Sequence, residues 1–285
     1  MLKIAIPNKG RLYQDTRALM EEAGLEVRAL SDRALSASLG GEFEALFVRA
    51  QDIPELVADG AADLGITGYD LIAESERGLS ELLDLEYGAC RLVVAASEER
   101  NLGFLENLPP DTKVATVFPN STRRFFTDRK LAITLVPMSG AVEIAPHLGI
   151  ADVIVDLTAT GSTLRSNGLR EVATIFESTA RLIARTSMSP AQLRMSDELV
   201  TALTSVLKAR GQRYLMANVP RDRLAEVKEV LPGLNGPTVI DILNGGRHVA
   251  VHAVVAARTV YRTISELKNL GAEGILVSRI ERLMS

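Results

Sequence analysis

Short apolar runs alternate with helix-like patterns along the first half of the chain, and this alternation predicts an α/β fold. The run Leu2–Ile6 is expected to form a buried strand, followed by an amphipathic helix over Leu12–Ala23. A second set of alternating elements opens with a strand at Arg91–Ala96. Because 285 residues are many for one hydrophobic core, we expect two or three domains.

Residues 211–285 follow a different pattern, in which two helices lie among four strands. The order βαββαβ is that of a ferredoxin-like module. Modules of this shape often bind regulatory ligands, although a fold alone does not establish a function. Strands are expected at Tyr214–Val219, Thr238–Leu243, His248–Val255 and Gly274–Ile280, with helices at Asp222–Val230 and Thr259–Leu270.

The charge balance argues against nucleic acid as a partner. The formal net charge is −4, tryptophan is absent and aromatic residues make up only 4% of the chain. A nucleic-acid surface usually combines a basic patch with aromatic rings on which bases stack. An anionic substrate must therefore be held by local basic residues and backbone amides.

The cysteine content and the apolar runs indicate a cytoplasmic protein. Cys90 is the single cysteine, which excludes an internal disulfide and is typical of a reducing compartment, and its apolar neighbours predict an inert, buried thiol. The first strand is followed directly by a polar turn, unlike the longer apolar stretch of a signal peptide. The longest apolar run, Val249–Ala257, is too short to span a bilayer, so no membrane association is expected.

The most informative segment is Asp152–Leu164, where an apolar strand ends in a carboxylate and leads through hydroxyl residues into a helix. Gly161 allows close approach of the backbone, and the start of the helix offers free amides to a phosphate. Asp156, at the carboxyl end of the strand, is placed to accept hydrogen bonds from ribose hydroxyls. Hydroxyl donors are available from Thr158, Thr160, Ser162 and Thr163.

Ordinary helix capping is the alternative explanation, because Ser and Thr are good N-caps. Four hydroxyl residues and a glycine within six positions exceed what capping needs, and this favours a site for a sugar phosphate. A helix terminus contributes only about 0.3–1 kcal/mol toward binding an anion. A basic side chain and Mg²⁺, which commonly takes substrate phosphates as ligands, are therefore expected as well.

Charged side chains also follow several strands of the first domain. Lys9, Gly10 and Arg11 come after the first strand, Arg49 follows another strand, and Asp70 follows a third. Each signal is weak alone, because a Lys-Gly-Arg turn is more often a solvated loop. Together they predict one shared rim at the carboxyl ends of parallel strands, where open α/β sheets bind ligands.

The histidines do not predict a metal site. Glu143 and His147 are four residues apart on a helix expected over 140–147, but one such pair supplies too few ligands and an ordinary surface pair is favoured. His248 and His252 share one face of an expected strand, where packing or effector binding is favoured over metal binding. We therefore predict no metal site made by protein side chains alone.

The segment Glu143–Leu164 resembles the signature of the ATP phosphoribosyltransferase family in the spacing from Glu143 to Gly149, Asp156 and Gly161. The resemblance extends over essentially the whole chain. Other segments that resemble the family are Asn8–Leu12, Arg49 with Asp52–Pro54, Asp63–Ile66, Ser166–Leu169, Tyr214–Met216, Pro237–Thr238 and Gly271–Ala272.

This resemblance implies a pentosyltransferase that condenses ATP with phosphoribosyl pyrophosphate (PRPP). The products would be N1-(5-phosphoribosyl)-ATP and pyrophosphate, in the first step of histidine biosynthesis. It implies two catalytic α/β domains built like type 2 periplasmic binding proteins, residues 1–88 with 181–210 and residues 89–180. It further implies a regulatory domain over 211–285 that binds histidine as a feedback inhibitor, in a homo-hexamer built from dimers.

The resemblance also implies roles for individual residues, with Mg²⁺ as the cofactor. Asp156 and Glu143 would hold the ribose hydroxyls of PRPP, and with Lys9 they form the expected catalytic set. The 5-phosphate would contact Thr158, Ala159, Thr160, Gly161, Ser162 and Thr163. ATP and pyrophosphate would lie among Lys9, Gly10, Arg11, Arg49 and Asp70. The histidine inhibitor would lie near Leu234, Thr238 and Ala253.

Other functions stay open from the residues alone. A regulatory protein that has lost catalysis is one, although the presence of Asp156, Gly161 and Thr163 argues against it. Two more are binding or transfer functions. One is a noncatalytic, cleft-type protein that binds a small molecule, although a secreted protein of that kind should begin with a signal peptide. The other is a phosphoribosyltransferase for a different base, which would share the sugar-phosphate loop but usually has a single core domain.

Overall fold

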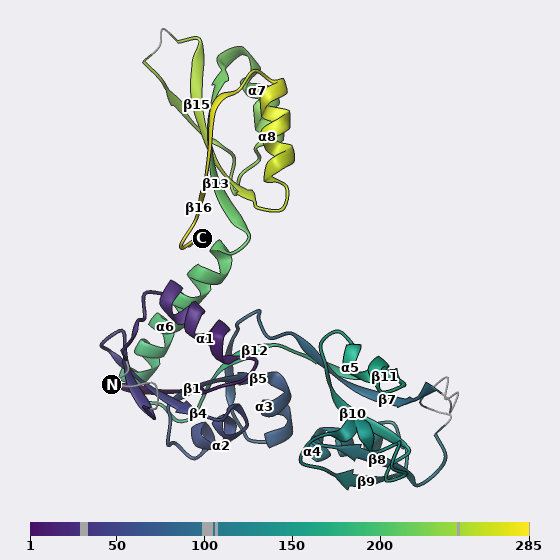
Figure 1. The fold of residues 1–285 in the computed structure, drawn as a ribbon. Helices are drawn as coiled ribbons and strands as arrows, with labels where there is room; N and C mark the ends of the chain where they lie inside the picture. Colours follow the sequence, from purple (N-terminus) through teal and green to yellow (C-terminus); the bar gives the residue numbers. More distant parts are fainter. Residues whose placement is uncertain (29–33, 99–104, 106–107, 244–245, 285) are drawn as a thin grey trace. The chain divides into compact units, whose positions relative to one another are not determined.

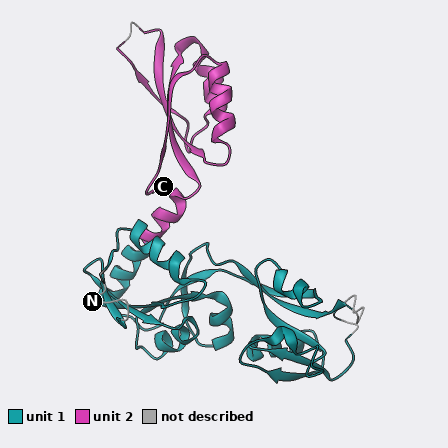
Figure 2. Ribbon diagram, in the orientation of Figure 1, with its two compact units in different colours: residues 1–200 teal, residues 201–285 magenta. Residues whose placement is uncertain are grey.

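The computed structural model describes residues 1–28, 34–98, 105, 108–243 and 246–284. The chain divides into two compact units, residues 1–200 and residues 201–285 (Figures 1 and 2). The first unit contains a seven-stranded and a five-stranded sheet, and the second contains a four-stranded sheet. The predicted α/β class with a C-terminal βαββαβ module is confirmed.

We call the seven-stranded sheet and its helices lobe A. Its strand order is β2-β3-β4-β1-β5-β12-β6. Its helices are α1 (Tyr13–Glu22), the short η1 (Ala50–Asp52), α2 (Ile53–Ala58) and α3 (Tyr69–Ser75). Its strands are β1 (Leu2–Pro7), β2 (Val27–Arg28), β3 (Ser36–Leu39), β4 (Phe43–Val48), β5 (Leu64–Gly68), β6 (Ser80–Asp84) and β12 (Ala180–Ala184).

The centre of lobe A is a buried, parallel part of its sheet. β1 pairs with β4 on one side and β5 on the other, both in parallel, so the carboxyl ends of these three strands share one edge. Parallel strands are typically covered on both faces, and every residue of β5 is buried. A Cβ on Gly65 would lie 2.5 Å from Ile53 and 2.8 Å from Val57, so glycine at this position lets α2 pack directly on the sheet.

We call the five-stranded sheet and its helices lobe B. Its strand order is β11-β7-β10-β8-β9, and β10 runs parallel to β8 but antiparallel to β7. The helices are α4 (Pro119–Asp128), the single turn η4 (Val142–Ile144) and α5 (Ser162–Ser166). The strands are β7 (Cys90–Ser97), β8 (Thr112–Thr116), β9 (Ile133–Pro137), β10 (Val153–Thr158) and β11 (Leu169–Ser178).

The helix predicted over 140–147 is wrong. Only Val142–Ile144 is helical there, as a single 3₁₀ turn followed by further turns. The backbone just before it is left-handed at Ala141, with a φ of 52°, and Pro146 follows closely. A proline inside a helix removes a hydrogen bond and clashes with the preceding turn, so an α-helix cannot extend through this segment.

Two connections join lobe A to lobe B, because β12 returns the chain to the sheet of lobe A between β5 and β6. One connection leads from β6 to β7 and the other from β11 to β12. They are hydrogen-bonded to each other: Leu85 N–H donates to the carbonyl of Ala180, and Ala180 N–H donates to that of Tyr87, each at 2.9 Å.

The second unit is a four-stranded antiparallel sheet in the order β14-β15-β13-β16, with α7 and α8 packed on one face (Figure 1). The long helix α6 (Pro190–Ala209) begins in the first unit and ends in the second. Among the described residues, no helix is long and apolar enough to cross a membrane. The remaining elements are β13 (Gln212–Pro220), η5 (Arg221–Arg223), α7 (Leu224–Val230), β14 (Thr238–Asp241), β15 (His248–Ala256), α8 (Val260–Asn269) and β16 (Glu273–Arg279).

Candidate functional site

The predicted rim of lobe A exists, because the parallel pairing aligns the ends of its strands. Pro7 at the end of β1 lies opposite Val48 at the end of β4. A pocket of about 390 Å³, which we call the lobe A pocket, opens at this edge. Lys9, Gly10 and Arg49 line it together, so it offers two cations beside a glycine turn. Its other lining residues are Asn8, Ala50, Gln51 and Leu71.

Arg11 and Asp70, predicted on the same rim, are engaged with the connections between the lobes. Asp70 is only 2% exposed, and the hydroxyl of Ser178 donates to its Oδ1 at 2.6 Å. Arg11 Nη2 lies 3.5 Å from the same oxygen, and Arg11 Nη1 donates to the carbonyl of Gly88. The Asp70 carboxylate is therefore engaged by Ser178 and orients the Arg11 guanidinium. Sequence reasoning missed Ser178, because it lies 108 residues from Asp70.

In lobe B, the predicted sugar-phosphate segment forms a tight turn between β10 and α5, and we call residues 158–163 the β10–α5 loop. Gly161 has a φ of 73°, a left-handed conformation that favours glycine. Thr158 is buried, and its hydroxyl accepts a hydrogen bond from Gly161 N–H at 2.9 Å. Thr158 therefore shapes the turn from inside. The outward-facing, exposed members of the loop are Ala159, Thr160, Ser162 and Thr163.

Two carboxylates lie beside this loop. Asp156 is on β10, two residues before the loop, and Glu143 is in η4. Burial raises the pKa of the Asp156 carboxyl, the hydrogen bond from Leu157 N–H lowers it, and the negative charge of Glu143 raises it further. The structure thus brings the two predicted ribose-binding carboxylates within electrostatic reach of each other.

This pKa shift predicts a pH-dependent stability difference for Asp156→Asn. The pKa of Asp156 is higher in the folded state than in the unfolded state. The stability contributed by the neutral carboxyl is therefore fully present at pH values below the unfolded-state pKa, and it is lost as the pH rises through the folded-state pKa. Asparagine never ionises, so the variant should melt at a higher temperature than the parent near pH 7 and at a similar one near pH 3. Thermal unfolding followed by circular dichroism measures this difference. A difference that stays constant between these pH values would show that ionisation of Asp156 does not cause it.

Arg165, in α5, was not predicted as a site residue. Its Nη2 donates to the carbonyl of Thr160 at 3.2 Å, so a guanidinium lies against the β10–α5 loop. The signal that could have found it is local, because residues four apart share one face of a helix and Arg165 follows Gly161 by four positions. Glu171 lies nearby and pairs with Arg91 at 3.0 Å.

The other groups singled out in the sequence have structural partners. Cys90 is buried, as predicted, and burial raises the pKa of its thiol. His147 Nε2 lies 2.8 Å from the carbonyl of Asn167. His252 Nδ1 lies 2.5 Å from the hydroxyl of Tyr214. Among the residues that the structure describes, no group of three or more His, Cys, Asp or Glu side chains is arranged to hold a metal ion.

The three residues expected near the histidine inhibitor do not share one face of the C-terminal sheet. Thr238 pairs across strands with His252, so their side chains lie on the same face. Ala253 is the next residue along β15 and therefore points to the opposite face, where it belongs to the core under α7 and α8. Leu234 is 56% exposed and lies in the loop before β14.

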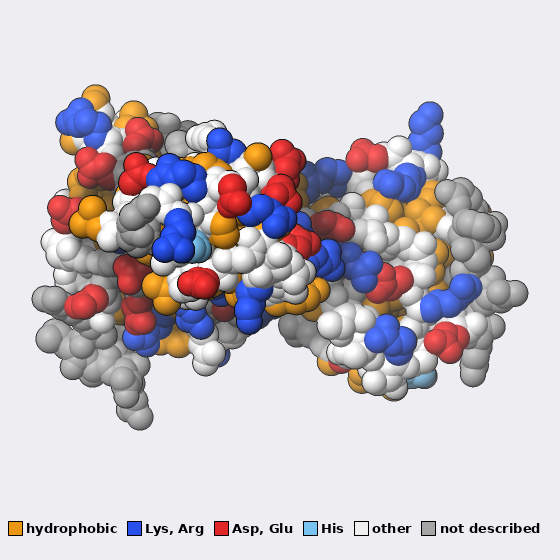
Figure 3. Space-filling model, turned by 90° about the horizontal axis from the view of Figure 1, so that it is seen from above, with side chains coloured by type: hydrophobic (Ala, Val, Ile, Leu, Met, Phe, Trp, Pro, Cys, Tyr) orange, Lys and Arg blue, Asp and Glu red, His pale blue; other side chains and the backbone are white. Residues whose placement is uncertain are grey.

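The surface carries charges of both signs. On the face shown in Figure 3, basic and acidic side chains are interspersed. This distribution agrees with the small net charge of −4. An anionic substrate must therefore be held locally, by groups such as those around the lobe A pocket and the β10–α5 loop.

Comparison with known protein families assigns the chain to a class. The family model described as ATP phosphoribosyltransferase matches residues 49–208, and the model described as the HisG C-terminal domain matches residues 209–282. The two-lobed fold, together with these matches, defines a phosphoribosyl-transferring enzyme. The chain belongs to the ATP phosphoribosyltransferase family.

Individual relatives agree with this assignment over the full length. The chain is 65% identical to the ATP phosphoribosyltransferase of Gemmatimonas aurantiaca, covering 100% of both chains. It is 48% identical to that of Halorubrum lacusprofundi, covering 99% of this chain and all of the other. The structure also resembles a chain of the ATP phosphoribosyl transferase (HisG:HisZ) complex from Thermotoga maritima. That match has a TM-score of 0.61 and 30% identity, covering 72% of this chain and 97% of the other.

Proposed function

We propose that the β10–α5 loop of lobe B binds PRPP and that the lobe A pocket binds ATP, for the reaction that defines the family. The chain is an ATP phosphoribosyltransferase of the first step of histidine biosynthesis, whose substrates are ATP and PRPP. The observation that carries the placement of PRPP is a left-handed glycine turn with exposed hydroxyls, next to the carboxylates of Asp156 in β10 and Glu143 in η4.

On the PRPP side, Asp156 and Glu143 accept hydrogen bonds from the ribose hydroxyls. Exposed hydroxyls and backbone amides of the β10–α5 loop bind the 5-phosphate, because the first-turn amides of a helix have no partner inside it. Thr158 holds the turn in shape, and Arg165 supplies the nearby positive charge. The loop residues assigned to the 5-phosphate are Ala159, Thr160, Gly161, Ser162 and Thr163.

On the ATP side, Lys9 and Arg49 neutralise phosphate charge in the lobe A pocket, and Gly10 allows close approach of the nucleotide. Gly10 is left-handed, and a Cβ added to it would meet no atom within 4 Å, so the space beside it is open. The guanidinium of Arg11 adds a third positive charge near the phosphates of ATP. Asp70 acts through Arg11, since Ser178 and Arg11 already surround its carboxylate.

The chemistry then requires little from the side chains beyond position and charge. N1 of adenine already carries a lone pair, so it attacks C1 of the ribose while pyrophosphate leaves, and no general base is needed. When ATP and PRPP are both bound with N1 in line with C1, a bimolecular reaction becomes an effectively unimolecular step. Cations such as Lys9 stabilise the charge that develops on the leaving pyrophosphate.

A divalent metal ion is required by the family, and we propose Mg²⁺. Mg²⁺ is usually held by one or two carboxylates together with substrate phosphates and water. Asp156 and Glu143 fit that mode, because they provide two carboxylates beside the proposed ribose position. When bound, the ion neutralises charge on the pyrophosphate oxygens.

We further propose that residues 211–285 bind histidine as a feedback inhibitor. The support is a self-contained hydrophobic core in the C-terminal sheet and the match of its residues to the HisG C-terminal domain. Leu234 and the exposed Thr238 remain the proposed neighbourhood of the effector, whereas Ala253 lies in the core on the opposite face of the sheet. Family members that carry this C-terminal module are the long form of the enzyme. By likeness to them, the proposed assembly is a homo-hexamer built from dimers, and the proposed location is the cytoplasm.

Release of pyrophosphate tests the proposed reaction. With ATP, PRPP and Mg²⁺ together, the protein should release pyrophosphate in step with formation of the N1-substituted nucleotide. Either substrate alone should give none, and replacing ATP with other nucleobases or nucleotides should abolish the signal. Equal release with another base would favour a phosphoribosyltransferase of different specificity.

A further inference from the structure

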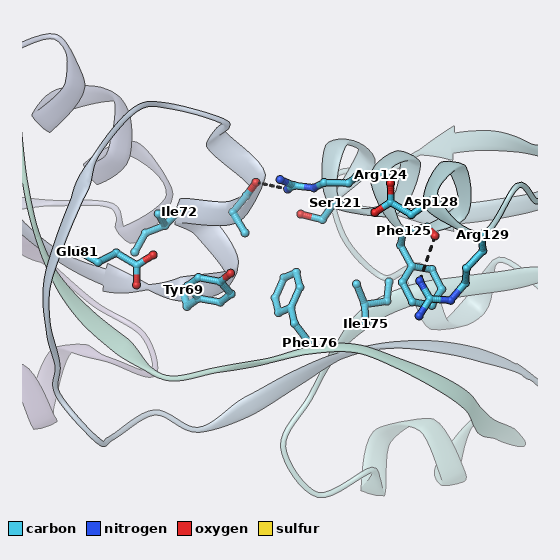
Figure 4. A pocket seen from close by; sticks show the side chains of 11 residues that line it. Tyr69, Ile72, Glu81, Ser121, Arg124, Phe125, Asp128, Arg129, Ile175 and Phe176 are labelled. Atoms are coloured by element: carbon cyan, nitrogen blue, oxygen red, sulfur yellow. Dashed lines mark hydrogen bonds between the residues drawn. The ribbon is translucent and has the colours of Figure 1, made fainter. Parts of the chain in front are cut away.

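A pocket of about 400 Å³ lies between lobe A and lobe B, where α3 faces α4 (Figure 4). Tyr69 enters it from α3, Ser121 and Arg124 from α4, and Phe176 from β11. Along this pocket the two helices are joined by hydrogen bonds that centre on Glu74, near the end of α3.

The sequence of α4 leaves the start of this helix without a cap of its own. Phe118, at the N-cap position, has no polar side chain, and Pro119 has no N–H to donate. The next two amides both donate to one carboxylate of the other lobe: Asn120 N–H to Glu74 Oε1 at 2.8 Å, and Ser121 N–H to Glu74 Oε2 at 2.9 Å. A carboxylate is also the group that the positive end of a helix favours. Lobe A thus supplies the cap that lobe B lacks.

Two further hydrogen bonds tie the same helices together. Asn120 Nδ2 donates to the backbone carbonyl of Glu74 at 2.9 Å. Arg124 Nη2 donates to the carbonyl of Ala73 at 2.8 Å, the bond drawn at the upper centre of Figure 4. We call these four hydrogen bonds the Glu74 latch. All four connect α3 of lobe A to α4 of lobe B.

The latch holds lobe B by the edge that carries the β10–α5 loop. β8 and β10 run parallel and in register, with Thr116 opposite Val155. Their carboxyl ends therefore lie at the same edge, where α4 follows β8 and the β10–α5 loop follows β10. In lobe A, the helix α3 that carries Glu74 also contributes Leu71 to the lining of the lobe A pocket. The Glu74 latch thus links the two proposed substrate sites through short, hydrogen-bonded segments.

We propose that Glu74 is a positioning residue for phosphoribosyl transfer: its carboxylate, bound to the start of α4, sets the β10–α5 loop opposite the lobe A pocket so that the two substrates meet in line. This inference rests on the proposed placement of PRPP in lobe B and ATP in lobe A. Glu74 touches neither substrate. Its removal should therefore affect the transfer step more than the binding of either substrate alone.

The test compares Glu74→Ala, Glu74→Gln and the parent enzyme in turnover and in binding. We expect kcat of Glu74→Ala to fall about 10-fold or more, because misplacement of reactants by about 1 Å is costly. Dissociation constants for PRPP alone and ATP alone, from titration calorimetry, should change less than about twofold, since each site lies within one lobe. Glu74→Gln keeps an acceptor oxygen but loses the charge. Its kcat should therefore lie between that of Glu74→Ala and that of the parent enzyme.

Two further variants sharpen the test. Glu226→Gln makes the same chemical change on an exposed carboxylate that pairs locally with Arg223, and it should keep the parent kcat. Asn120→Ala removes another hydrogen bond of the latch. The fold-decrease in kcat of the Glu74→Ala, Asn120→Ala double variant should be smaller than the product of the fold-decreases of the two single variants. Circular dichroism should show all variants folded.

Three results would contradict the inference or its basis. A kcat within twofold of the parent for Glu74→Ala would overturn it. So would a loss of PRPP affinity equal to the loss of kcat, because that pattern indicates damage to lobe B rather than misplacement. Absence of turnover in the parent enzyme would overturn the proposed function, and the inference with it.

Discussion

Replacing Asp156 with asparagine is expected to lower kcat/KM for PRPP about 100-fold, equivalent to about 2.7 kcal/mol. The carboxylate lies at the end of β10, beside Glu143 and the β10–α5 loop. Hydrogen bonds to a charged acceptor contribute about 1.5–3 kcal/mol each, and an amide replaces one acceptor oxygen with a donor. Steady-state kinetics with PRPP varied at saturating ATP measures the effect.

A matched control for this substitution lies in the same lobe. Asp111 is exposed and has a φ of 62°, a left-handed conformation that asparagine adopts readily, so Asp111→Asn makes the same chemical change away from the site. This control should retain the parent kcat/KM. Parent-like use of PRPP by Asp156→Asn would remove Asp156 from the proposed ribose site.

Ending the chain after Arg210 is expected to abolish inhibition by histidine while leaving turnover measurable. Residues 215–272 contribute a hydrophobic core that belongs to the C-terminal sheet and its two helices. The truncated chain keeps both lobes and the whole of α6, which ends at Ala209. Initial rates with and without histidine measure the change, and equilibrium dialysis should show that histidine binding is lost as well.

The full-length chain, assayed at the same protein concentration, is the reference for this truncation. It should be inhibited by histidine under conditions where the truncated chain is not. Truncation also removes the hydrogen bond from Leu283 N–H to the carbonyl of Ser205, so the melting temperature of each protein should be recorded. Undiminished inhibition of a folded, truncated enzyme would place the histidine site outside residues 211–285.

Local patterns in the sequence were sufficient to predict most strands and helices. The expected strand Arg91–Ala96 lies within β7, and the expected strand Leu2–Ile6 differs from β1 by one residue. Apolar runs are reliable signals where a strand is covered on both faces. The strand β6 had no such signal, because Ser80–Asp84 pairs only with β12 at the edge of the sheet and is largely exposed.

The candidate site could be predicted where its residues follow one another or follow parallel strands. Lys9 and Arg49 line the same pocket because β1 and β4 are parallel and in register. Contacts between segments that are far apart in the chain cannot be predicted from a local sequence pattern. Ser178 lies 108 residues from Asp70, and Glu74 lies 46 residues from Asn120, so neither partner could be inferred from spacing.

The paired connections between lobe A and lobe B also constrain how the enzyme can move. A single tether would let one lobe swivel and twist freely, whereas two segments bonded to each other through Leu85 and Ala180 resist twisting and leave bending as the soft motion. Opening for substrate entry and closing for transfer would then follow nearly the same path. Fewer orientations need to be lost on closure, so less conformational entropy opposes the assembly of the reactive complex.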